Sequence, residues 1–199
     1  MMKDIPGCIE YLDLPPIPKD VQDKIIRDAH YFINIPITEG DKTYYFEQIP
    51  ARYGPDTVYF KYYMYPPVEF VQDVIQPLFE KPLVYVLSVI KSHTGNPSMF
   101  WPHHDHDRYS GIQINLDNGG DNVLTRFYKQ FPRRPNMYDN LYDFDQIGDM
   151  HEIQTEENKW VIFNPTIVHS VHNVTDTRIT LAIDTGDLIH YDVMYSHFK

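Results

Sequence analysis

Apolar and polar positions along the chain predict two helices followed by a series of short strands. Apolar residues at helical spacing predict helices over 20–32 and 67–79. Short runs rich in β-branched and aromatic residues, separated by turn signals, predict strands at 43–49, 58–65, 82–91, 110–116, 123–128, 160–163, 168–174 and 178–183. Because no helical pattern interrupts the strands after residue 80, the sequence favours a β-sandwich or barrel.

The length and the order of these elements suggest how the chain is organised. Its 199 residues predict a single domain spanning 1–199. We expect residues 1–82 to form supporting helices and strands, residues 83–185 the β-rich core, and residues 186–199 a C-terminal tail. A long polar insertion at 131–158 predicts either a solvated loop or a lid over a substrate.

The charge and the single cysteine narrow the class of protein. The formal net charge is −11, which argues against sequence-independent binding of nucleic acid. No apolar run is long enough for a signal peptide or a membrane helix, and Cys8 has no second cysteine to pair with. These features favour a cytoplasmic protein with no membrane segment. A local basic stretch predicts either binding of an acidic substrate or ion pairs with the insertion; its members are Arg126, Lys129, Arg133 and Arg134.

Histidines and acids cluster in the segment 101–108, where a metal site is the first hypothesis. His103 and Asp105 stand two residues apart, so on a strand both side chains point to the same face. About one His-x-acid pair is expected by chance in this composition, and the chain has two. The second pair, His190 and Asp192, lies close to the C-terminus and leaves no later strand for a third ligand.

A third ligand and an anion anchor follow downstream of the first pair. His169 lies in a β-branched run, and Arg178 follows nine residues later, with Thr180 two positions beyond it. An arginine beside a hydroxyl is well suited to binding a small carboxylate. His172 is an alternative distal ligand, although it stands only six residues before Arg178 and on the opposite strand face from His169.

On these residues the sequence resembles the iron(II)- and 2-oxoglutarate-dependent dioxygenases. The signature of that family is His-x-Asp/Glu, a distal histidine, and a basic residue about ten positions after it. The resemblance covers 83–185 and is closest to hydroxylases of the prolyl or aspartyl/asparaginyl kind, some of them encoded by bacteriophages. It rests there on His103, Asp105 and Arg108, followed by a strand ending in Ile114-Asn115-Leu116.

The resemblance implies a mainly β fold with flanking helices around a double-stranded β-helix, the jelly-roll or cupin-like barrel. It implies that His103, Asp105 and His169 hold Fe(II). It also implies that Arg178 and Thr180 bind the co-substrate 2-oxoglutarate, with Asn115 as a weaker further contact. The implied reaction uses O2 to hydroxylate an unactivated C–H bond of a peptide or protein residue or a small molecule, releasing succinate and CO2.

Two other functions remain open from the sequence. One is a cupin-type metal enzyme that does not use 2-oxoglutarate and that would employ His104 and His106. The other is a non-catalytic jelly-roll protein, with a binding or viral structural role. A phage-encoded enzyme would act in the host cytoplasm.

Overall fold

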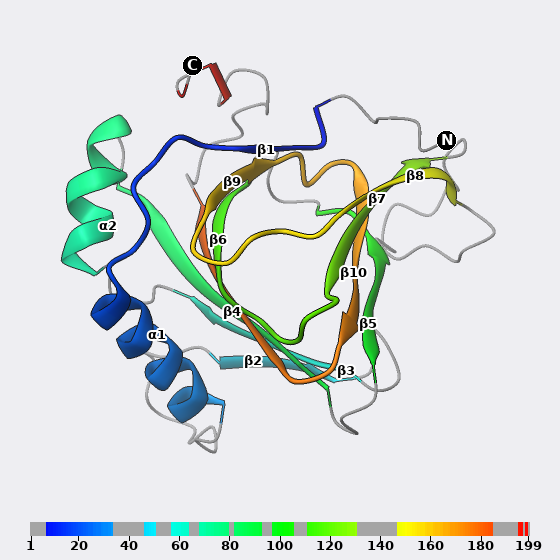
Figure 1. Ribbon diagram of the computed structural model, residues 1–199, viewed down its shortest axis with the longest axis horizontal. Helices are drawn as coiled ribbons and strands as arrows, with labels where there is room; N and C mark the ends of the chain where they lie inside the picture. The colour runs from blue at the N-terminus through cyan, green and yellow to red at the C-terminus, as the bar shows by residue number, and fades with distance from the viewer. Residues whose placement is uncertain are drawn as a thin grey trace.

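Two antiparallel β-sheets face each other across the interior of a barrel (Figure 1). The computed structural model describes residues 7–33, 46–50, 57–63, 68–79, 82–92, 97–105, 111–130, 147–184, 195, 196 and 198. The larger sheet contains, in spatial order, β1 (Ile9–Tyr11), β9 (Trp160–Phe163), β6 (Gly111–Asn118), β11 (Thr177–Asp184), β4 (Val84–Ser92), β3 (Thr57–Tyr63) and β2 (Phe46–Pro50). The smaller sheet contains β5 (Ser98–His103), β10 (Val168–Val174), β7 (Leu124–Gln130) and β8 (Ile147–Ile153). This arrangement confirms the predicted mainly β jelly-roll fold with flanking helices.

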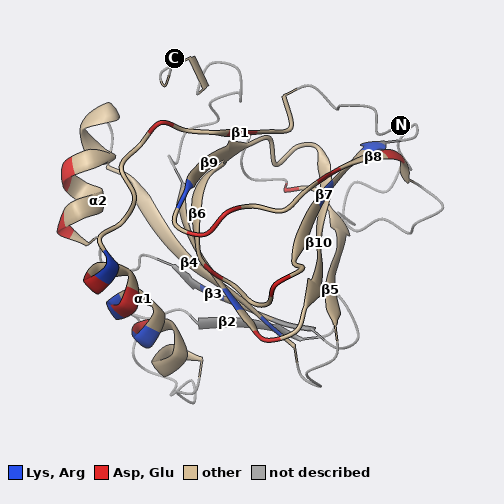
Figure 2. Ribbon diagram, viewed as in Figure 1, with Lys and Arg blue, Asp and Glu red and all other residues tan. Residues whose placement is uncertain are grey.

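The helices cover the outer face of the larger sheet. They are α1 (Lys19–Phe32), α2 (Glu69–Val74) and the short 3₁₀ turn η1 (Gln76–Leu78). Exposed i,i+4 ion pairs join Lys19 to Asp23 and Lys24 to Asp28, and Figure 2 shows these charges along α1. The helix predicted at 67–79 is divided in two, because Pro77 cannot continue the α-helical hydrogen bonding. No helix within the described residues is both long enough and apolar enough to cross a membrane.

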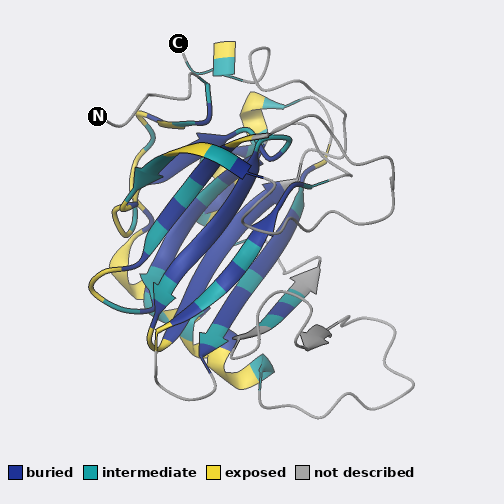
Figure 3. Cartoon of the chain, turned by 90° about the vertical axis from the view of Figure 1, so that its right-hand side faces the viewer, coloured by how far each residue is buried: buried dark blue, intermediate teal, exposed yellow. Residues whose placement is uncertain are grey.

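The main hydrophobic core lies between these helices and the larger sheet, outside the barrel. Alternate residues of the central strands point toward the helices, as the two-residue period of a strand requires. On β11 these are Ile179, Leu181 and Ile183, each no more than 1% exposed. The residues between them, such as Thr180, point into the barrel and line its cavity. In Figure 3 the buried residues accordingly concentrate in the strands.

A β-bulge interrupts the pairing of β6 with β11. Ile179 lies opposite Asp117, but Thr180 lies opposite Asn115, so Leu116 is the extra residue. The backbone carbonyl of Leu116 accepts a 2.8 Å hydrogen bond from the buried side chain of Gln22 on α1. The bulge is thereby tied to the helix layer, and Asn115 is presented to the barrel interior.

Three strands were not expected from the sequence pattern. β1 has only three residues, β5 covers a segment for which no strand was expected, and β8 lies within the insertion expected at 131–158 to be a loop. β8 pairs antiparallel with β7 and forms the edge of the smaller sheet. The rest of the expected lid, residues 131–146, lies outside the described part of the chain, as do the tail residues 185–194.

Candidate metal centre

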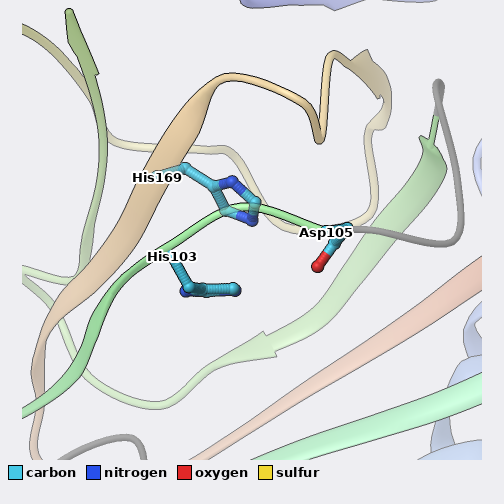
Figure 4. A group of neighbouring side chains, drawn as sticks. All are labelled: His103, Asp105 and His169. Carbon is cyan, nitrogen blue, oxygen red and sulfur yellow. The ribbon is translucent and has the colours of Figure 1, made fainter. Parts of the chain in front are cut away.

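The side chains of His103, Asp105 and His169 lie close together (Figure 4). Their ligand atoms all lie within 4.8 Å of one another. The two histidines are buried and Asp105 is half-buried. In the part of the chain that the structure describes, this is the one cluster of histidine, cysteine and acidic side chains with such spacing. The structure thus brings together the three residues singled out as metal ligands.

Strand pairing places the two histidines opposite each other. β10 runs antiparallel to β5 with His169 directly across from His103, and the ring centroids are 4.4 Å apart. Asp105 follows the end of β5, where its backbone N–H donates a 2.9 Å hydrogen bond to the carbonyl of Pro165. Pro165 lies in the turn between β9 and β10, so this bond ties the acid to the strand that carries His169.

Backbone hydrogen bonds select the same tautomer of both imidazoles. Nδ1 of His103 lies 2.7 Å from the carbonyl oxygen of Trp101, and Nδ1 of His169 lies 2.9 Å from that of Ile167. A carbonyl oxygen only accepts, so each Nδ1 carries the hydrogen and each Nε2 keeps its lone pair. Metal-binding histidines have this second contact in most known sites, because it orients the ring and makes the other nitrogen more basic.

The surroundings keep His103 neutral. Burial, reinforced by the nearby His169, lowers the pKa of His103 from 6.5 to about 3. Aromatic rings wall the site: Phe100 packs edge-on against His103, and Phe163 packs in the same way against His169. Two imidazoles and one carboxylate in a mostly apolar wall form the donor set that a divalent transition metal prefers.

Arg178 and Thr180 lie on β11, where both contact one amide. The Oδ1 atom of Asn115 accepts hydrogen bonds from Nη2 of Arg178 (3.1 Å) and from the hydroxyl of Thr180 (2.9 Å). Arg178 is only 3% exposed, and burial lowers its pKa to about 10. It therefore stays charged at neutral pH, and its orientation is set by Asn115.

Gly119, in a tight turn after β6, packs against the start of β11. Gly119 has a φ of +75°, and its carbonyl accepts the N–H groups of Thr175 and Asp176 at the start of β11. A Cβ atom at this position would lie 2.7 Å from the backbone nitrogen of Arg178. Glycine is required at this contact because of both the conformation and the close approach.

One cavity of about 120 Å³ contains the metal-ligand cluster and the arginine. His103, Asp105, His169, Arg178 and Thr180 all line it. Two buried polar atoms on its wall, Nη1 of Arg178 and the hydroxyl of Thr125, have no hydrogen-bond partner among the described residues. Buried polar groups are nearly always paired, so these two atoms indicate the position of a ligand that accepts hydrogen bonds.

Asn115 accepts a hydrogen bond from Arg178 but does not line the cavity. Gln113, two residues earlier on β6, does line it. Sequence reasoning missed four polar residues that line the cavity: Tyr59, Lys61, Ser88 and Thr125. They lie on strands β3, β4 and β7, and on β3 and β4 they alternate with core residues. The alternation was visible in the sequence, but which face would meet the metal site was not.

The remaining sequence candidates lie elsewhere. His104 is buried and lies outside the cluster, and His106, Arg108, His190 and Asp192 fall outside the described residues. His172 faces away from the cavity, where its Nε2 lies 2.7 Å from Ser170 Oγ and 3.1 Å from Tyr128 Oη. In the basic stretch, Arg126 pairs with Glu152 at 2.6 Å and Lys129 lies 3.9 Å from Asp149. Both acids belong to the insertion, as the ion-pair interpretation expected.

Two buried neutral histidines predict a loss of stability in acid. The pKa of His103 is lowered to about 3 and that of His172 to about 4, in each case first by burial. Since their unfolded-state pKa is about 6.5, the unfolded chain binds these protons first, and the free energy of unfolding falls with decreasing pH. From about pH 7 to about pH 5, we expect the metal-free protein to lose about 2 kcal/mol per histidine. Urea unfolding at the two pH values measures this, and equal free energies would contradict it.

Comparison with known proteins identifies structures of the same fold. No family model matches the sequence, and no curated protein matches it either. A prolyl-4-hydroxylase from Pseudomonas putida has a TM-score of 0.51 and 12% identity, covering 89% of this chain and 91% of its own. A prolyl hydroxylase from Trichoplax adhaerens, solved with a hypoxia inducible factor peptide fragment, has a TM-score of 0.52 and 9% identity, covering 88% and 81%. The epimerase SnoN in complex with Fe3+ and alpha ketoglutarate has a TM-score of 0.52 and 11% identity, covering 89% and 78%.

These similarities establish the class of fold. The chain has the jelly-roll fold that it shares with these prolyl hydroxylases and with the epimerase SnoN, and it carries a His-Asp-His cluster able to hold a metal ion. The similarity covers nearly nine-tenths of the chain, so it extends well beyond the segment 83–185 that carries the sequence motifs.

Proposed function

We propose that this protein is an Fe(II)- and 2-oxoglutarate-dependent oxygenase. Its substrate would be a peptide or protein residue or a small molecule, hydroxylated at an unactivated C–H bond. The observation that carries the proposal is the single cavity that joins a His-Asp-His donor set to a buried arginine with an unpaired guanidinium nitrogen. The two sites are complementary to the two ends of a 2-oxo dicarboxylic acid.

The donor set fits Fe(II) in charge and in number. His103 and His169 offer Nε2 lone pairs, and Asp105 offers one carboxylate oxygen that offsets part of the metal charge. Three protein ligands on one face leave the other positions of an octahedral ion open for a chelating co-substrate and O2. Bound Fe(II), with O2 and 2-oxoglutarate, would supply the oxidising chemistry that yields succinate, CO2 and a hydroxylated product.

The chain's own residues would bind and orient the co-substrate. Arg178 would pair with its distal carboxylate through the unpaired Nη1, and the hydroxyls of Thr180 and Thr125 line the same cavity. Asn115 would act as a positioning residue, because it holds Arg178 and Thr180 from outside the cavity. The apolar rings beside the histidines would limit water around the reacting atoms.

The cavity volume also bears on the substrate. Pockets that hold a whole drug-sized ligand usually measure about 300–1,000 Å³, and this one measures about 120 Å³. We therefore expect the cavity to hold the co-substrate and only the reacting end of the primary substrate. The remainder of the substrate would lie over the cavity mouth.

An anaerobic titration tests the proposed function. Adding 2-oxoglutarate to the Fe(II)-loaded protein without O2 should produce the visible metal-to-ligand charge-transfer band, because the 2-oxo acid chelates the ion. Admitting O2 should then form succinate, even slowly and without a primary substrate. The same titration with succinate in place of 2-oxoglutarate is the matched control and should give no band. If folded, metal-loaded protein showed neither the band nor succinate formation, the proposal would be wrong.

This titration also separates the rival functions. A cupin-type enzyme that does not use 2-oxoglutarate would bind the metal without forming the band. A non-catalytic jelly-roll protein would bind Fe(II) weakly or not at all.

A further inference from the structure

The orientation of the Asn115 amide decides what Thr180 can offer to a ligand. A guanidinium group only donates hydrogen bonds, so the Asn115 atom 3.1 Å from Nη2 of Arg178 is the carbonyl oxygen Oδ1. On its other side the amide nitrogen donates to the buried hydroxyl of Thr155 and, at 3.2 Å, to Oδ1 of Asn118. The amide thus has the one orientation that satisfies all of these contacts.

This orientation uses the single proton of the Thr180 hydroxyl. Oδ1 of Asn115 only accepts, so the 2.9 Å contact between them is a hydrogen bond that Thr180 donates. Toward the cavity, which it lines, Thr180 therefore presents lone pairs. A carboxylate also presents only lone pairs. The contact that the sequence resemblance implied for Thr180 with the co-substrate consequently needs another donor.

Thr125 supplies a hydroxyl whose proton is not used. It lies on β7 of the smaller sheet, lines the cavity and is 7% exposed, and its oxygen has no hydrogen-bond partner among the described residues. Nη1 of Arg178, on the larger sheet, is unpaired in the same way. Both unpaired atoms belong to residues that line one cavity of about 120 Å³. The structure therefore provides one unpaired donor from each sheet.

Strand register places Thr125 at the depth of Arg178 in the barrel. Thr125 lies opposite Val171 of β10, two residues beyond His169. Val171 belongs to one apolar cluster with Ile90 of β4, and Ile90 lies directly opposite Arg178. Two residues of a strand span about 6.8 Å, so Thr125 lies about one such step deeper than His169. A 2-oxo dicarboxylic acid that chelates a metal at His169 has two methylene groups with which its distal carboxylate reaches this depth.

We propose that Thr125, and not Thr180, donates the neutral hydrogen bond to the distal carboxylate of 2-oxoglutarate. The inference rests on the proposed oxygenase function and changes which residue completes the anchor. Arg178 contacts the carboxylate from the larger sheet, and Thr125 contacts it from the smaller one. Thr180 instead donates to Asn115, beside the bond from Arg178. Because the two donors lie on facing sheets, the packing of the sheets sets the space available to the carboxylate.

Co-substrate affinity in paired variants tests this assignment. Each protein is loaded with Mn(II), and binding of 2-oxoglutarate is measured by titration calorimetry. Thr125→Val keeps the shape of the side chain and removes the hydroxyl, so we expect the 2-oxoglutarate Kd to rise roughly 10- to 100-fold, since a hydrogen bond to a charged group is lost. Thr125→Ser, which keeps the hydroxyl, should stay within about threefold of the wild type. Thr180→Val should also stay within about threefold, because Asn115 retains its bond from Arg178.

An analogue without the distal carboxylate separates this contact from a general change of the cavity. 2-Oxopentanoate has the same chelating end and a methyl group where 2-oxoglutarate has its distal carboxylate. Thr125→Val and the wild type should therefore bind 2-oxopentanoate equally. Thr177→Val is the matched control variant, because it removes a buried hydroxyl that donates to Asp176 and does not line the cavity. It should leave the Kd of both ligands unchanged, and thermal unfolding checks that every variant is folded.

Three results would overturn the proposal. The first is an unchanged 2-oxoglutarate Kd in folded Thr125→Val. The second is a loss in Thr180→Val at least as large as that in Thr125→Val, which would return the contact to Thr180. The third is an equal loss for 2-oxoglutarate and 2-oxopentanoate in Thr125→Val, since the hydroxyl would then act on the cavity and not on the carboxylate. Absence of 2-oxoglutarate binding to the Mn(II)-loaded wild type would instead count against the oxygenase function itself.

Discussion

Asp105→Ala should abolish metal-dependent turnover of 2-oxoglutarate. Asp105 is the one carboxylate of the donor set, and its removal leaves only the two imidazoles to hold a divalent ion. Loss of a group that merely supports a metal ligand typically costs 10–100-fold in affinity, so loss of a ligand should weaken Fe(II) binding by more than about 100-fold. Fe(II) affinity by competition with a chelator, together with succinate formation, measures the effect.

The matched control is Asp149→Ala. Asp149 is half-exposed on β8 and lies 3.9 Å from Lys129, outside the cavity. This change removes the same charge and should leave Fe(II) affinity and succinate formation unaltered. If Asp105→Ala bound Fe(II) within about tenfold of the wild type, Asp105 would not be a ligand, and the metal site would have to be assigned to other residues.

Arg178→Ala should raise the KM for 2-oxoglutarate by roughly 100-fold, with Fe(II) affinity nearly unchanged. A buried charge pair that loses one partner costs about 2–5 kcal/mol, and 100-fold corresponds to about 2.7 kcal/mol. Arg178→Lys should recover part of the loss, because it restores the charge but not the planar contact with Asn115. Steady-state succinate formation over a range of 2-oxoglutarate concentrations provides the measurement.

Arg126→Ala is the control for this second prediction. Arg126 pairs with Glu152 on the smaller sheet and does not line the cavity, so its removal should leave the 2-oxoglutarate KM within about twofold. Thermal unfolding of both variants checks that each remains folded. An unchanged KM in folded Arg178→Ala would remove Arg178 as the co-substrate anchor and leave the unpaired Thr125 hydroxyl as the next candidate.

The positions of most strands along the chain, and the faces that their side chains share, were predictable from local information. A strand presents every second side chain to one face, so alternation predicts β6, β10 and β11 and places Arg178 and Thr180 together. The same rule predicted His103 and Asp105 on one face of a strand, whereas Asp105 follows the end of β5. These inferences use only positions close in sequence, where the backbone period fixes direction.

Contacts between segments far apart in sequence were beyond that reasoning. Lys61 reaches the cavity because β3 pairs with β4, which in turn pairs with β11. Asn115 meets Arg178 and Thr180 because of a bulge at Leu116, and no propensity of that leucine predicts an extra residue. β8 was taken for loop because its sequence is polar, yet pairing with β7 satisfies its backbone as an edge strand.

The sequence by itself determined the β-rich class, the strands that carry His169 and Arg178, and the His-x-Asp…His…Arg order. Those features follow from side-chain period and spacing, which are local properties of the chain. Only the tertiary structure decided that the three ligand atoms lie within 4.8 Å, that an Arg178 nitrogen is buried without a partner, and that Lys61 shares their cavity. Those features depend on sheet register and on the packing of two sheets face to face, which bring together residues more than a hundred positions apart, such as Lys61 and Arg178.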